Sequence, residues 1–123
     1  MLWVELADTP EKQRSGLMFR KHLSDSSGMM FKFSYPQKLK FWGRNTFIPL
    51  DIAFISKDDT ITNIEQIPPL SHDCVASTQE CVCAIEANVG FFKHNKISIG
   101  DRVVFCDNEQ EDDKYLVIFK KEE

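Results

Sequence analysis

The segment Phe41–Asp51 carries the densest set of side chains that could hold a ligand. Trp42 offers a flat face on which a sugar, a base or a cation can stack. Arg44 can clamp a carboxylate or a phosphate with two parallel hydrogen bonds, and Asn45 and Thr46 can orient a bound molecule. The segment therefore predicts a binding site. The alternative is a tight turn closed by Asn45 and Thr46, with Trp42 in the core.

Two carboxylates add a second kind of chemistry. Asp51 heads an apolar strand, where a charged group needs a partner, and Arg20 or Arg44 would supply one. Without a partner, Asp51 would have a raised pKa and could act as a general acid or base. Glu86 ends another apolar strand in the same way. If the two converge, a carboxylate pair of the kind used by hydrolases or lyases would form.

Three hypotheses about function follow. The first is a non-enzymatic binding module for a small polar or anionic ligand, with a saccharide as one example. Its site would be lined by Arg20, Trp42, Arg44, Asn45, Thr46 and Asp51. The second is a hydrolase or lyase that uses Asp51 and Glu86. The third is a structural or interaction domain without a small ligand. No motif in the chain calls for a cofactor.

The cysteines allow two further arrangements. His72, Cys74, Cys81 and Cys83 form a candidate zinc site, although their spacing is irregular for that metal. Cys74 and Cys81 flank a six-residue loop and would form a disulfide if the protein is exported. Cys83 and Cys106 lie in apolar runs and are expected to be buried thiols.

The elements that must position these residues are mostly short strands separated by turns. Leu2, Val4 and Leu6 alternate with other residues in the period of a strand. Further strands are expected at 29–33, 39–42, 51–55, 61–64, 81–86, 102–106 and 114–120, with short helices near 8–14 and 88–94. This pattern predicts a mainly β, antiparallel sandwich or closed barrel with two short helices.

Length and composition limit the number of domains and the classes of partner. The chain has 123 residues, enough for one domain over 1–123 and too few for two. Its net charge of −4 argues against general nucleic-acid binding. No apolar run is long enough to span a membrane, and no targeting segment is recognised in this chain. Oligomeric state and compartment are not predicted.

Four stretches, taken in order, resemble the domain of unknown function 192 family over about residues 4–105. They are Glu5–Glu11 with Arg14 and Gly16–Arg20; Gly28–Phe31; Phe41–Trp42 with Asn45–Ile52 and Phe54–Ile55; and Ile85–Asn88 with Gly90 and Ile99–Asp101. The resemblance implies a small, jelly-roll-like or barrel-like β domain, often exported, without a settled activity.

The chain departs from that family pattern at three positions. Gly43 stands where a bulky Met is usual, Arg44 where Lys is common, and Cys83 where an aromatic residue is common. If that Met packs against a ligand in the family, Gly43 leaves a roomier site here.

Overall fold

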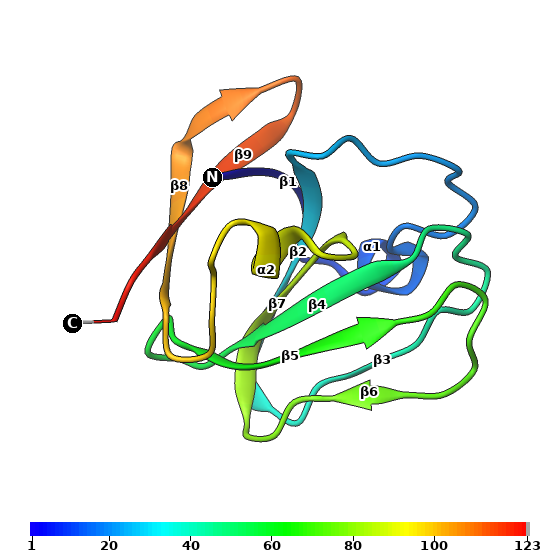
Figure 1. Ribbon diagram of the computed structural model, residues 1–123, viewed down its shortest axis with the longest axis horizontal. Coiled ribbons are helices and arrows are strands. Elements are labelled where there is room, and N and C mark those ends of the chain that lie inside the picture. The colour runs from blue at the N-terminus through cyan, green and yellow to red at the C-terminus, as the bar shows by residue number, and fades with distance from the viewer. Residues whose placement is uncertain (123) are drawn as a thin grey trace.

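The computed structural model describes residues 1–122, in which strands predominate over two short helices (Figure 1). The elements, in chain order, are β1 (Leu2–Ala7), α1 (Pro10–Ser15), β2 (Ser27–Gln37), β3 (Lys40–Phe41), β4 (Leu50–Ile55), β5 (Ile61–Ile67), β6 (Val75–Ala76), β7 (Cys81–Asn88), α2 (Phe91–His94), β8 (Arg102–Glu111) and β9 (Lys114–Lys120). The predicted mainly β class and the two short helices are confirmed.

The strands form one seven-stranded sheet in the order β5-β4-β7-β2-β1-β9-β8, and β3 pairs with β6 in a separate two-stranded sheet. The expected closed barrel is wrong, because within residues 1–122 the outer strands meet only at an isolated bridge between Thr60 and Arg102. The expected all-antiparallel pairing is also wrong, because β1 and β2 run parallel. Parallel neighbours need a long crossover, and the segment that contains α1 provides it.

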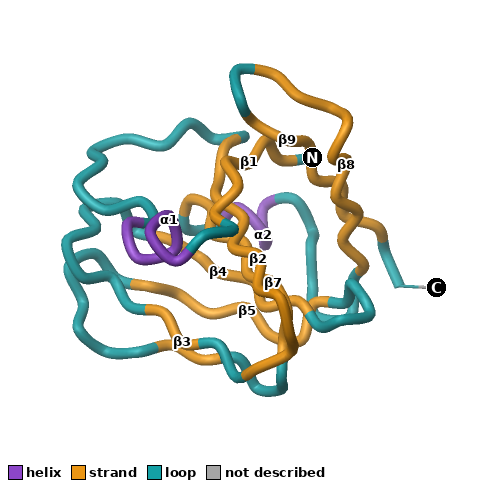
Figure 2. The backbone as a smooth tube through the Cα atoms, turned by 180° about the vertical axis from the view of Figure 1, so that it is seen from behind, coloured by secondary structure: helices purple, strands orange, loops and turns teal. Residues whose placement is uncertain are grey.

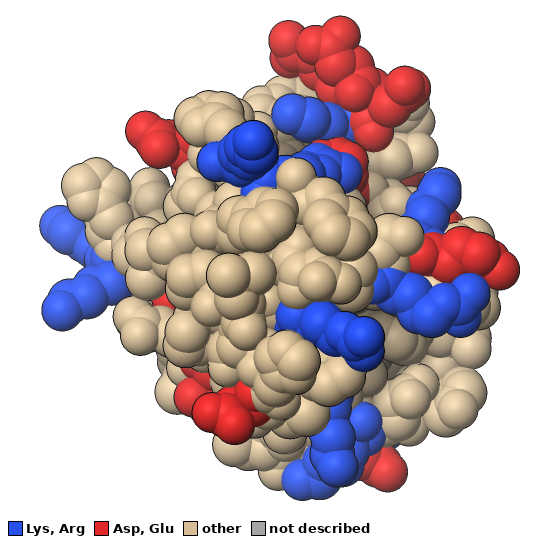
Figure 3. Space-filling model, turned by 90° about the vertical axis from the view of Figure 1, so that its right-hand side faces the viewer, with Lys and Arg blue, Asp and Glu red and all other residues tan. Residues whose placement is uncertain are grey.

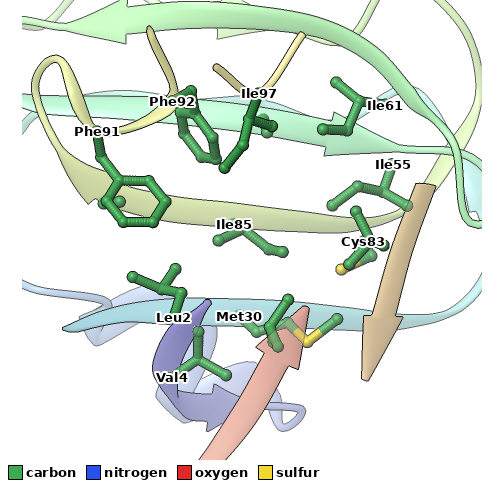
Figure 4. Close-up of a cluster of buried hydrophobic side chains, with 14 residues drawn as sticks. Leu2, Val4, Met30, Ile55, Ile61, Cys83, Ile85, Phe91, Phe92 and Ile97 are labelled. Carbon is green, nitrogen blue, oxygen red and sulfur yellow. The ribbon is translucent and has the colours of Figure 1, made fainter. Parts of the chain in front are cut away.

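Hydrophobic side chains cover both faces of the sheet. Successive residues of a strand point to opposite faces, so buried strands supply two cores. One core includes Leu2, Val4, Ile85, Phe91 and Phe92, and Figure 4 shows these side chains packed together. The other core lies across the sheet and is built from different side chains of the same strands, together with neighbouring loops. Its members include Met29, Phe31, Ile52, Phe54 and Ala84.

The start of α1 follows from its first residues. Thr9, in extended conformation, accepts a hydrogen bond on its Oγ1 from the Lys12 amide at 3.2 Å, and Pro10 occupies the first turn. Thr9 is therefore the residue that caps α1. Gln13 donates from its side chain to the Lys32 carbonyl at 2.7 Å and ties the helix to β2. Figure 2 shows the long loops gathered on the side of the molecule that contains α1.

The C-terminal hairpin is longer than the sequence indicates. Strand β8 continues through the acidic stretch to Glu111, and Asp112 and Asp113, both at positive φ, make the turn into β9. The exposed acidic side chains at this tip correspond to the group at the top of Figure 3. No helix among residues 1–122 is long and apolar enough to cross a membrane.

Candidate ligand-binding site

A cavity of about 540 Å³ lies between α1, β2 and the segment from Lys40 to Thr46. We call it the α1 cavity; its lining residues include Arg14, Phe31, Phe33, Lys40, Phe41, Trp42, Arg44, Asn45, Thr46 and Glu86. Its volume is within the range that holds small molecules in proteins. Four of the six predicted ligand residues, Trp42, Arg44, Asn45 and Thr46, meet here.

Aromatic rings form one wall of the α1 cavity. Phe41 lies edge-on to Phe31, with ring centroids 4.8 Å apart, and edge-on to Phe33 at 6.5 Å. These are favoured geometries for aromatic pairs. Behind this wall, Phe41 also contacts the fully buried Phe54 at 5.9 Å. The wall therefore rests on the core and is pre-formed.

Main-chain hydrogen bonds join three loops at the mouth of the cavity. The Phe19 amide donates to the Asn45 carbonyl at 2.7 Å, and the Leu70 amide donates to the Thr46 carbonyl at 2.9 Å. Phe19, Asn45 and Leu70 all have positive φ, between 57° and 65°. Asn tolerates this conformation, whereas Phe and Leu rarely adopt it. Backbone strain of this kind gathers at functional sites.

Three cationic side chains line the cavity. Arg14 comes from α1, Lys40 from β3 and Arg44 from the loop that follows β3. None of the three forms a salt bridge within residues 1–122. The Arg44 guanidinium lies over the Trp42 ring, 5.5 Å from its centroid, and Trp42 remains 43% exposed. The alternative interpretation, in which Trp42 belongs to the core, is therefore wrong.

Glu86 is the only acidic residue that lines the α1 cavity among the described residues. Its side chain is buried, with 5% of the residue exposed, and burial raises the pKa of its carboxyl to about 8. Asp51 and Glu86 do not converge. Glu86 pairs with Ile52 in the β4–β7 register, so Asp51, one residue earlier, points to the opposite face. The predicted carboxylate pair is therefore not assembled.

Two of the predicted ligand residues, Arg20 and Asp51, lie outside the α1 cavity and make structural contacts. Arg20 forms a bidentate salt bridge with Glu5, which lowers the pKa of Glu5. Both line a second, polar hollow on the far side of Gly16. Asp51 is buried, and its Oδ2 accepts a hydrogen bond from the Gly90 amide at 2.8 Å. Neither arginine pairs with Asp51, contrary to expectation.

The family departure at Gly43 has a structural cause. Gly43 is buried, and a Cβ atom at this position would lie 2.4 Å from the Pro68 carbonyl oxygen. Its amide donates to the Ser71 carbonyl at 3.0 Å. Gly43 does not line the α1 cavity, so the expected enlargement of the site at this position is wrong. The glycine instead allows the 68–71 loop to approach.

The cysteines form neither of the expected arrangements in the structure. All four are free thiols, with Cys74 exposed and Cys81 buried, so the Cys74–Cys81 disulfide is not present. Cys81 and Cys83 belong to different cores. Across residues 1–122 no cluster of three or more potential metal ligands occurs, and this includes His72 with the cysteines. The His72 ring lies beside Trp42, with centroids 5.9 Å apart.

The prediction from sequence missed two cations and the aromatic wall. Arg14 and Lys40 come from short elements and carry no pattern that separates them from ordinary surface charges. For Glu86 the sequence predicts only a role as the catalytic partner of Asp51. The sequence does contain a sign that Glu86 is unusual. It follows the apolar run Cys83-Ala84-Ile85 at a strand position that alternation assigns to a buried face, where a carboxyl group is not expected.

Comparison with known proteins places the chain among relatives. None of the curated proteins matches it. A protein from Sinorhizobium meliloti 1021, described as a "putative transcription regulator", is 37% identical, with a TM-score of 0.79 over 82% of this chain and 79% of that one. A protein of unknown function from Novosphingobium aromaticivorans DSM 12444 is also 37% identical, with a TM-score of 0.78 over 80% of this chain and 71% of that one. The model of the family DUF192, described as "Uncharacterized ACR", matches residues 1–105. The chain belongs to the DUF192 family.

Proposed function

We propose that this protein is a binding module for a small anionic ligand, held in the α1 cavity. The observation that carries the proposal is the set of three cations, Arg14, Lys40 and Arg44, that line a cavity with an aromatic wall and have no acidic partner there. The three cations are exposed and have no salt-bridge partner within residues 1–122, so an anion bound in the cavity would give them an opposite charge.

The aromatic wall adds a preference for shape. Phe31, Phe33 and Phe41 form an apolar surface beneath the cations, and Trp42 adds a half-exposed ring at the mouth. A flat ligand body can stack here while its charged group reaches Arg44. Because the loops around the mouth are joined by backbone hydrogen bonds, little of the binding free energy is lost in ordering the site.

A nucleic acid is not the ligand we propose. The description of the Sinorhizobium protein as a transcription regulator belongs to that protein. This chain carries a net charge of −4, whereas binding to a phosphate backbone depends on many cations. Three cations around one cavity instead match a single small anion.

A thermal-shift titration tests the proposal. We expect benzoate or phenyl phosphate to raise the Tm of the parent protein in a concentration-dependent way, and glucose not to do so. Arg44→Ala should weaken the response by about tenfold, as the loss of one charge-assisted contact implies. Asn45→Ala tests whether the loop that carries Asn45 contributes to binding. The matched control is Lys93→Ala, which removes an exposed cation on α2, across the sheet from the cavity.

Three outcomes would contradict the proposal. The first is that neither aryl anion raises the Tm. The second is that Arg44→Ala and Lys93→Ala respond as the parent does, because binding would then occur outside the α1 cavity. The third is a response to glucose alone, which would identify the site as a saccharide site without a need for charge.

A further inference from the structure

Glu86 lies in the middle of the seven-stranded sheet, on the face that carries the α1 cavity. The strand registers align Glu5 of β1, Met29 of β2, Glu86 of β7 and Ile52 of β4 in one row across the sheet. Met29 and Ile52 belong to the core on this side. Glu86 therefore lies between apolar side chains of the two neighbouring strands and lines the cavity.

The carboxyl group of Glu86 is unpartnered. Among the side-chain hydrogen bonds and salt bridges within residues 1–122, none involves Glu86, and burial is the only influence on its pKa. Within residues 1–122, Asp51 Oδ1 is the one buried polar side-chain atom that has neither solvent contact nor a hydrogen-bond partner. The unpaired oxygens of Glu86 are not in this class, so they are accessible to solvent. The Glu86 oxygens are therefore reached from the cavity that this residue lines.

The charged groups near Glu86 come from every element around the cavity. Arg14 on α1, Lys40 on β3 and Arg44 on the next loop line the same cavity. Glu5 on β1 and Glu65 on β5 each lie two strands away in the row. Glu5 is paired with Arg20, and Glu65 accepts a hydrogen bond from the Asn63 side chain at 2.9 Å. None of these charges contributes to the pKa of Glu86, which is about 8 because of burial. The group therefore carries its proton at neutral pH. Glu86 is buried, whereas Arg14, Lys40 and Arg44 are exposed.

We propose that Glu86 is the specificity-determining residue of the α1 cavity and that, as an uncharged acid, it donates a hydrogen bond to the inner end of the ligand. The ligand class is then a flat anion, such as an aryl carboxylate, with a hydrogen-bond-accepting oxygen opposite its charged end. This inference rests on the proposed function, because the cations must hold the charged end at the mouth. The aromatic wall would hold the body between the two ends.

A buried acid favours an acceptor over an ammonium group at this place. An uncharged carboxylic acid supplies one O–H donor. An ammonium group would require Glu86 to ionise in a site where ionisation is already unfavourable. It would also have to pass Arg14, Lys40 and Arg44, which repel it.

Two probes of matched shape test the role of Glu86. 4-Acetylbenzoate carries a carbonyl oxygen at the inner end, and 4-isopropenylbenzoate replaces that oxygen by a methylene group of the same planar geometry. Calorimetric titration at pH 7 should show that the parent binds 4-acetylbenzoate about tenfold more tightly, the value of one buried hydrogen bond. Glu86→Leu should reduce this ratio to about 1. Glu86→Gln, whose amide also donates, should keep a preference for the carbonyl.

Raising the pH provides a second readout. Between pH 7 and pH 9 the parent should lose its preference for 4-acetylbenzoate, because ionised Glu86 can no longer donate. Glu86→Gln should keep its preference, since an amide does not titrate in this range. Neither probe changes its charge in this interval, so the change would come from the protein. A circular dichroism spectrum of each variant shows that the fold is retained.

Each contrary outcome has a separate meaning. An equal ratio in the parent and in Glu86→Leu would overturn the inference while leaving the proposed function intact, because both benzoates would still bind. Tighter binding of 4-(aminomethyl)benzoate than of 4-acetylbenzoate by the parent would also overturn it, since Glu86 would then act as a carboxylate. If neither benzoate binds and the Arg44 test also fails, the proposed function fails with it.

Discussion

Replacing Glu86 by Gln should stabilise the protein, and the stabilisation should be much larger at pH 7 than at pH 5. In the folded protein, burial raises the pKa of Glu86 from 4.5 to about 8. Between these values the folded state holds a proton that the unfolded chain has released. Because the folded state binds more protons in this range, stability falls as the pH rises.

The size of the effect follows from the same two pKa values. Proton linkage for one group that shifts from 4.5 to about 8 predicts that its contribution to folding becomes less favourable by about 2–3 kcal/mol between pH 5 and pH 7. Glutamine has nearly the same shape and does not titrate. The difference in unfolding free energy between Glu86→Gln and the parent should therefore grow by about that amount over the interval.

Urea unfolding at pH 5, 6 and 7 measures this difference. The lowered pKa values of Glu5 and Asp101 give stability that is lost only as the pH falls below the range of an unfolded carboxyl group, outside the interval. Glu109→Gln is the matched control, because Glu109 is exposed on the β8–β9 hairpin. Parallel stability curves for the parent and Glu86→Gln would refute the reasoning, since Glu86 would then ionise as freely in the folded state as in the unfolded one.

Three further predictions concern the structure around the site. Gly43→Ala should destabilise the protein by about 1–3 kcal/mol in urea unfolding, because its Cβ would lie 2.4 Å from the Pro68 carbonyl oxygen; an unchanged midpoint would contradict this contact. Thr9→Ala should cost about 1 kcal/mol through loss of the α1 cap, whereas Thr9→Ser should retain most of it. A thiol reagent should label exposed Cys74 quickly in the native protein and Cys83 only after unfolding, since burial shields Cys83 and raises its pKa; rapid labelling of both would place Cys83 outside the core.

The local parts of the fold could be predicted from sequence. The hairpin formed by β4 and β5 depends on two apolar runs and the turn between them, and all three lie close together in sequence, between Leu50 and Ile67. The β8–β9 hairpin is similar, although its acidic residues suggested a loop where β8 continues. Polar residues on exposed strands give little local evidence of pairing, because the partner strand supplies the hydrogen bonds.

The long-range parts could not be predicted in the same way. The parallel pairing of β1 with β2 depends on how the crossover through α1 packs, and no short pattern specifies it. The α1 cavity depends on the same packing. Arg14 lines it from α1, which the Gln13 side chain attaches to β2. Trp42, Arg44, Asn45 and Thr46 could be predicted together because they are adjacent in sequence.

Asp51 and Glu86 show how one residue of register separates a structural role from a proposed functional one. They lie on neighbouring strands and are both buried, and each has a carboxyl oxygen without a protein partner. The register pairs Asp51 with Ala87 rather than with Glu86, so their side chains leave the sheet on opposite faces. Asp51 meets the Gly90 amide and is sealed, whereas Glu86 opens to the α1 cavity. Asp51 therefore holds the turn before α2, and Glu86 is the carboxyl group that remains available to a ligand.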